Sequence, residues 1–123
     1  MEYGIDYYAE KIKAQFNTPK YFDEEEARDI MGHLYLEAAL LFPLQKLLEA
    51  GSDTGRIKKY ISFIEDMNQN GNDEIKCIVE FVLLEYLLDL KNTEVRRRLY
   101  KYSSPKLCET IREVEDYIKN RGY

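Results

Sequence analysis

The sequence predicts an all-α fold, and three observations lead to that prediction. No segment of the 123 residues alternates apolar and polar side chains as a half-buried strand does. Apolar residues instead recur three and four positions apart, which is the spacing of one face of a helix. Capping residues, glycines and prolines divide the chain at short intervals. We therefore predict one domain over residues 1–123, with six or seven helices in an antiparallel bundle or an α-solenoid-like stack around a buried central helix at 73–90.

The central helix is predicted from the most apolar stretch of the chain, DEIKCIVEFVLLEYLLDL. At about 100° per residue, its apolar side chains fall on two faces, and charged side chains lie along the seams between them. A helix of this kind is expected to be enclosed by other helices, with its seams near solvent. The first face comprises Ile75, Val79, Val82, Leu83, Tyr86 and Leu90, and the second comprises Cys77, Phe81, Leu84 and Leu88.

Three helices are predicted in the first part of the chain. The first covers residues 3–16 and ends because Thr18 precedes a proline, where helical backbone angles are disfavoured. Asp23 is the expected N-cap of the second. Pro43 either kinks that helix or begins a new one at its first position. We prefer a new short helix that ends at Gly51.

Four more helices are predicted after this point, the central helix among them. The helix before the central one is expected to end at about Asn68, ahead of the Asn-Gly-Asn turn at 70–72, and the last helix at about Asn120. The predicted N-caps are Ser52 or Asp53, Asp73, Thr93 and Ser104, the last of which is followed by a proline at the first helical position.

Charge is distributed unevenly along the chain. The net charge is −5, but residues 1–90 carry −9 and residues 91–123 carry +4. An acidic surface repels nucleic acid and favours basic partners. The N-terminus lacks the pattern of a signal peptide, and the apolar stretch is interrupted by acids and shorter than the roughly 20 residues of a membrane span. We expect a cytoplasmic protein with two reduced cysteines and no membrane association.

Candidate metal and catalytic residues are few. Asp66, Asn68, Asn70 and Gly71 match the first half of a calcium-binding EF-hand loop, but its twelfth position, where a bidentate glutamate is required, is Cys77. The alternative is a helix end followed by an Asn-Gly turn, which needs the same residue types. The single histidine, His33, and the cysteines, Cys77 and Cys108, are read as structural residues. We therefore predict no metal, no cofactor and no catalytic residue.

Two further groups have alternative interpretations. Arg96, Arg97 and Arg98 beside Tyr100 resemble a basic, aromatic nucleic-acid patch, but three consecutive residues span about 200° of a helix, and salt bridges to acidic helices are the simpler interpretation. Glu85 is expected to be half-buried, either in a structural pair or as a carboxylate in a groove.

A partner-binding edge is predicted at the start of the second helix. Four carboxylates there exceed what the helix dipole requires, and two aromatic residues precede them, so this edge suits a basic protein. The seam of Glu74, Glu85 and Asp89 is the next candidate. Tyrosines outside the main apolar stripes are further candidates, because tyrosine suits partly wet interfaces. The residues of the edge are Tyr21, Phe22, Glu24, Glu25, Glu26 and Asp29, and the tyrosines are Tyr3, Tyr7, Tyr21, Tyr35 and Tyr123.

From about Tyr60 onward the chain resembles a loose group of small bacterial all-helical proteins, mostly uncharacterised, some of which are similar to immunity proteins encoded beside contact-dependent or secreted toxins. The resemblance implies a protein that neutralises a toxin by binding it, with no catalytic residue. A small helical adaptor or regulator is the alternative, and an enzyme is a third. The matching residues are Tyr60, Phe63, Ile64 and Glu65, the turn Asn72, Asp73 and Glu74, then Phe81, Leu84, Glu85, Leu88, Leu99 and the closing amphipathic helix.

Overall fold

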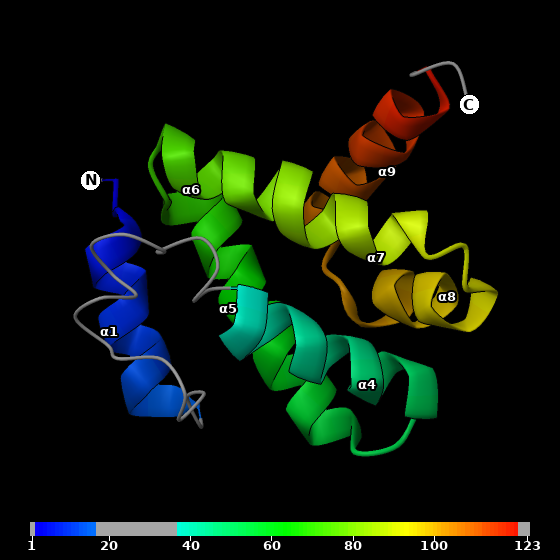
Figure 1. Ribbon diagram of the computed structural model, residues 1–123, viewed down its shortest axis with the longest axis horizontal. Helices are drawn as coiled ribbons and strands as arrows, with labels where there is room; N and C mark the ends of the chain where they lie inside the picture. The colour runs from blue at the N-terminus through cyan, green and yellow to red at the C-terminus, as the bar shows by residue number, and fades with distance from the viewer. Residues whose placement is uncertain (1, 17–36, 121–123) are drawn as a thin grey trace.

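The computed structural model describes residues 2–16 and 37–120, and in these ranges the protein is all-α (Figure 1). The prediction of an all-helical fold is confirmed. Apart from one isolated bridge between Tyr3 and Gly71, the described residues contain no β-structure. The elements are α1 (Ile5–Gln15), η1 (Glu37–Leu41), α4 (Phe42–Ala50), α5 (Thr54–Asn70), α6 (Asp73–Ile78), η2 (Val79–Leu84), α7 (Glu85–Asp89), α8 (Thr93–Tyr102) and α9 (Pro105–Lys119).

Side-chain caps begin four of these helices. Ser104 is confirmed as a cap, and of the two alternatives Ser52 and Asp53 the structure shows Asp53; each cap accepts a hydrogen bond from the backbone N–H three residues later. Two other predictions are wrong by one residue, because Asn72 caps α6 in place of Asp73, and Asn92 caps α8 in place of Thr93. The asparagine amide oxygen reaches the same free N–H groups, so the acid or threonine after it becomes the first helical residue.

Pro43 lies inside a continuous helical run. The π-helical η1 passes directly into α4, and Leu41 at the junction has helical backbone angles. Proline lacks an N–H and its ring collides with the preceding turn, so a helix that contains it must bend or widen. The preferred prediction of a new short helix is confirmed, because α4 starts at Phe42 with Pro43 in its first turn, although the π-helical η1 leads into it without a break. The run ends as predicted at Gly51, which has a φ of 70°.

A π-segment also interrupts the central helix. α6, η2 and α7 follow one another without a break, and we call them together the central run. A π-turn holds about one residue more than an α-turn, so the side chains beyond it are rotated relative to an uninterrupted α-helix. The position of the buried stripe therefore shifts by one residue part of the way along the run.

This shift corrects the prediction of two apolar faces. Leu87 is 1% exposed, although regular α-helical spacing does not include it in either face. Tyr86, predicted to be buried, is 40% exposed. On the second predicted face Leu84 is buried as expected, but Phe81 is 46% exposed. The central run therefore buries one side and presents the other to solvent, and it is not enclosed on all sides.

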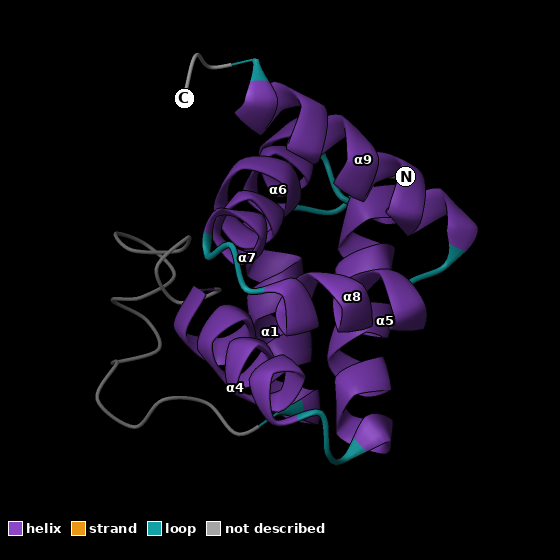
Figure 2. Ribbon diagram, turned by 90° about the vertical axis from the view of Figure 1, so that its right-hand side faces the viewer, coloured by secondary structure: helices purple, strands orange, loops and turns teal. Residues whose placement is uncertain are grey.

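The hydrophobic core lies between the central run and the helices that surround it. In Figure 1, α4 and α9 lie on opposite sides of the central run, and α5 crosses behind it. The view turned by 90° shows the same packing from the α8 side (Figure 2). Large side chains with under 2% exposure include Tyr8, Ile12, Leu40, Leu44, Leu48, Ile57, Ile61, Ile64, Met67 and Ile75.

α1 is attached to α5 through aromatic residues. The ring of Phe16 stacks on Tyr60 with 4.5 Å between centroids, and Tyr8 meets Phe63 edge-on at 5.8 Å. The Tyr8 hydroxyl donates a hydrogen bond to the carbonyl of Asp66 at 3.2 Å. Burial and the nearby Asp66 carboxylate raise the pKa of Tyr8 above its usual range. In the described ranges, no helix has the length and apolarity needed to cross a membrane.

Candidate functional site

The solvent side of the central run carries exposed aromatic residues at both of its edges. On the α4 edge, Phe42 meets Tyr86 edge-on with 6.1 Å between ring centroids. On the α9 edge, Phe81 meets Tyr117 at 5.3 Å and 68°. These four rings are each 40–46% exposed. Large rings left half in water on a protein surface are typical anchors of protein–protein contacts.

Carboxylates lie among these rings. Glu74 and Asp89 are exposed, and Glu80 and Glu85 are half-buried. Glu80 lines a cavity with Phe81 and Tyr117, and the predicted seam of Glu74, Glu85 and Asp89 lies on the same central run as Phe81 and Tyr86. The half-buried position expected for Glu85 is confirmed. We call this surface the acidic–aromatic face; it comprises Phe42, Glu74, Glu80, Phe81, Glu85, Tyr86, Asp89, Glu113 and Tyr117.

A small cavity of about 180 Å³ opens on this face between η2 and α9. Two aromatic rings and two carboxylates contribute to its walls, with one buried aliphatic side chain beside them. Glu113 and Tyr117 are one helical turn apart on α9, so they present their side chains in the same direction. The lining residues are Glu80, Phe81, Glu113, Val114 and Tyr117.

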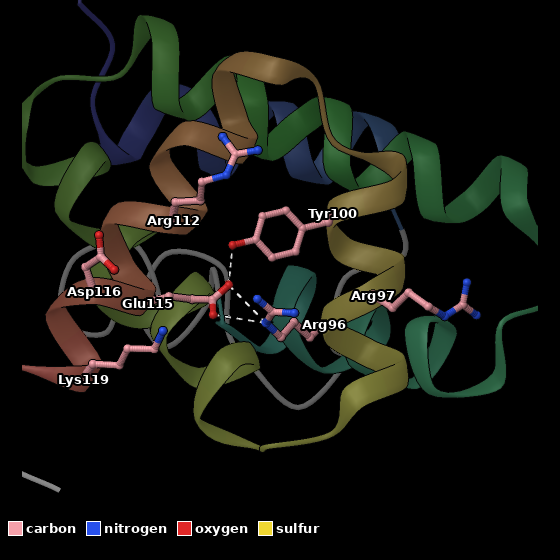
Figure 3. Close-up of a pocket in the computed structure, with 7 residues that line it drawn as sticks. All are labelled: Arg96, Arg97, Tyr100, Arg112, Glu115, Asp116 and Lys119. Atoms are coloured by element: carbon pink, nitrogen blue, oxygen red, sulfur yellow. Dashed lines mark hydrogen bonds and ion pairs between the residues drawn. The ribbon is translucent and has the colours of Figure 1, made fainter.

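A larger cleft of about 530 Å³ lies between α8 and α9 (Figure 3). Both Glu115 carboxylate oxygens accept hydrogen bonds from the Nε of Arg96, at 3.2 and 3.1 Å, and the Tyr100 hydroxyl also donates to Glu115. Guanidinium groups of Arg96 and Arg112 lie 5.0 and 6.0 Å from the centre of the Tyr100 ring. Burial and the hydrogen bond to Glu115 raise the pKa of Tyr100 to about 12. The contacts of Arg96 and Tyr100 with Glu115 therefore act as a clamp that holds α8 and α9 together across this cleft.

The other two arginines of the basic segment have different partners. Arg97 and Arg98 form ion pairs with Glu94 at 2.8 and 3.1 Å. An Nη group of Arg98 also donates to the carbonyls of Leu48 and Glu49, which are free acceptors at the end of α4. The arginines therefore form salt bridges as predicted, but among the described residues only Arg96 pairs with a carboxylate of another helix, whereas Arg97 and Arg98 share Glu94 of their own helix. Lys119 and Asp116 complete the cleft lining.

The residues matched to an EF-hand belong to a helix. α5 continues through Asn70, whose side-chain amide donates to the Asp66 carboxylate at 2.6 Å, while the Asn68 amide donates to Thr110 on α9. The interpretation as a helix end followed by a turn is confirmed. No group of three or more potential metal ligands occurs among residues 2–16 and 37–120.

Several predicted residues have different environments from those expected. Cys108 is buried, with its thiol near the carbonyls of Tyr100 and Ser103, as predicted for a core cysteine. Cys77 is exposed, because it lies on the solvent side of the central run, so its assignment to the core is wrong. Tyr3 and Tyr7 stack on each other, with 3.8 Å between ring centroids.

The predicted partner-binding edge falls outside the described residues. So do the single histidine and three of the tyrosines proposed for an interface. These residues are Tyr21, Phe22, Glu24, Glu25, Glu26, Asp29, His33, Tyr35 and Tyr123.

Glu113 and Tyr117 are the two residues of the acidic–aromatic face on α9 that sequence reasoning did not identify. The available signal was their i, i+4 spacing on α9, beside the apolar stripe of Leu107, Ile111 and Val114. Their approach to Phe81 depends on how α9 packs against η2, and no local pattern encodes that packing.

In the described ranges the protein is therefore all-α, with an exposed acidic and aromatic face. Residues 9–119 match the model of the family DUF7674, a domain of unknown function, and the chain belongs to that family. No curated protein and no solved structure matches the chain.

Proposed function

We propose that this protein is a non-catalytic, cytoplasmic binding protein of bacteria, an immunity protein that neutralises a toxin by direct contact. The observation that carries the proposal is the acidic–aromatic face, where four exposed rings lie among carboxylates. Aromatic rings supply most of the binding energy at typical interfaces, and surrounding charges select the partner and accelerate association. A basic toxin domain is the partner that this combination fits best.

The charge of the whole chain supports a basic partner. Residues 1–90, which include the central run and the predicted edge at residues 21–29, carry −9. A field of this sign draws a basic protein toward the surface before contact is made. The two acidic regions are therefore proposed to act together, with the rings of the central run as anchors.

The test is co-expression with the product of a neighbouring toxin gene. The protein is expected to restore growth of a strain that expresses the toxin, and the two purified chains are expected to form a stoichiometric complex. If no neighbouring product is toxic or binds, the immunity proposal is wrong. Self-association, or binding to a non-toxic cellular protein, would favour a helical adaptor instead.

A charge-reversal pair locates the interface. Glu74→Lys with Asp89→Lys should slow association strongly at low salt, and the difference from wild type should diminish as salt screens the field. The matched control is Asp6→Lys with Glu49→Lys, which makes the same change of charge at exposed positions of α1 and α4 that are not part of the face. Glu25→Lys with Glu26→Lys tests the edge at residues 21–29. Equal rates for the first pair and its control would place the interface away from the central run.

A further inference from the structure

The cavity between η2 and α9 is lined by both aromatic rings and carboxylates. Phe81 and Tyr117 meet at 68° and are each 46% exposed, so part of the aromatic surface is open to solvent. Glu80 on η2 and Glu113 on α9 line the same cavity, whose volume is about 180 Å³. Its opening is therefore bounded by aromatic surface and by two negative charges that come from different helices.

No cation of the described chain neutralises these two glutamates. Lys76 lies one turn before Glu80, but neither it nor any other described lysine or arginine forms an ion pair with Glu80 or Glu113. Glu94 and Glu115, by comparison, are paired with arginines of α8. A cation supplied by a ligand would pair with Glu80 and Glu113 in the same way.

We infer that this cavity binds an arginine side chain presented by a basic partner protein. A planar guanidinium can lie against an aromatic ring while its N–H groups reach carboxylates on two sides. Lysine offers a compact, strongly hydrated charge that matches this flat, two-sided arrangement less well. The inference rests on the proposed function only in taking the partner to be a protein, and the binding test below needs no partner.

The test uses N-acetylarginine amide and N-acetylcitrulline amide, which have nearly the same shape and differ in charge. Each is titrated into the nitrogen-labelled full chain, and amide NMR shifts are followed. The arginine probe should shift the amides of residues 80–81 and 113–117 in a saturable way, with weak affinity, and citrulline should not. An equal response to both probes, or arginine shifts that are absent from these residues, would overturn the inference.

Paired variants separate a formed site from general electrostatic attraction. Glu80→Gln with Glu113→Gln should weaken arginine binding by roughly fivefold or more, since two facing charges are lost. Asp6→Asn with Glu49→Gln removes the same charge at exposed positions of α1 and α4, outside the cavity, and should leave binding unchanged. Phe81→Leu with Tyr117→Leu should also weaken binding, with Tyr102→Leu on α8 as its control. If the control variants lose as much affinity as the cavity variants, the cavity is not the site.

The two proposals can fail separately. Arginine binding in the cavity without rescue from any toxin would remove the immunity proposal and retain the site. Rescue that is undiminished by Glu80→Gln with Glu113→Gln, combined with no probe binding, would remove the site and retain the immunity proposal.

Discussion

Glu115 on α9 accepts hydrogen bonds from the Nε of Arg96 on α8 through both carboxylate oxygens, at 3.2 and 3.1 Å. The glutamate side chain is only 16% exposed, whereas that of Arg96 is 56% exposed, so the carboxylate is the better shielded partner. The Tyr100 hydroxyl donates to the same carboxylate. One side chain of the last helix therefore receives two donors from the helix before it.

Glu115→Gln should lower the free energy of unfolding by about 1 kcal/mol, because it keeps the shape of the side chain but removes the charge that both donors face. Denaturant unfolding measures this difference. Asp116→Asn is the control, since it removes the neighbouring exposed carboxylate. Equal losses in the two variants would show that the clamp contributes nothing specific to stability.

Stability should fall at alkaline pH as Tyr100 loses its proton. Its pKa is raised in the folded protein from 10.0 to about 12. The folded state then holds the proton more tightly than the unfolded state between these values. The contribution of this group is therefore complete below pH 10 and is lost as pH rises through about 12. Tyr100→Phe should flatten the loss of stability across this window.

Tyr8 contributes to the same alkaline trend, because its pKa is also raised. Some pH dependence should therefore remain in Tyr100→Phe and should decrease further when Tyr8→Phe is added. Unfolding free energies measured at a series of alkaline pH values provide the comparison. An unchanged slope in Tyr100→Phe would contradict the role given to Tyr100.

Gly51 and Gly55 should respond in opposite directions to replacement by alanine. Gly51 has a φ of 70°, and an added Cβ would lie 2.3 Å from the Arg98 guanidinium carbon, so the bonds from Arg98 to the end of α4 would be disturbed. Gly51→Ala should cost about 1–2 kcal/mol. Gly55 lies in α5 with open space around it, so Gly55→Ala should be neutral or stabilise by up to about 1 kcal/mol. Thermal and denaturant unfolding measure both.

The π-segment of the central run makes a prediction about neighbouring residues. Leu87→Ala should cost about 2–5 kcal/mol, as expected for a fully buried leucine, whereas Tyr86→Ala should cost less than about 1 kcal/mol. An uninterrupted α-helix would reverse this order. A larger loss for Tyr86→Ala than for Leu87→Ala would mean that the run has regular α-helical register in solution.

Much of the architecture follows from local sequence. Helical spacing and the caps Asp53 and Ser104 predict α5 and α9 closely, because capping chemistry acts within three residues along the chain. The caps predicted at Asp73 and Thr93 are each displaced by only one residue, to Asn72 and Asn92, because adjacent polar side chains compete for the same N–H groups. The all-α class, the run from residue 73 to residue 89 and the terminal turns at Gly51 and Gly71 were all determined by the sequence alone.

Tertiary structure decided which side of the central run faces solvent. The π-segment that begins at Val79 gains no hydrogen bond over a regular α-helix, and no sequence pattern indicates it. The register of the residues beyond it is set by how the run packs on its neighbouring helices. That register exposes Phe81 and Tyr86 and buries Leu87. It also brings Phe81 to Tyr117, 36 residues away in sequence and 5.3 Å between ring centroids. Periodicity describes one helix at a time, so a surface shared by two helices depends on packing that only the folded chain establishes.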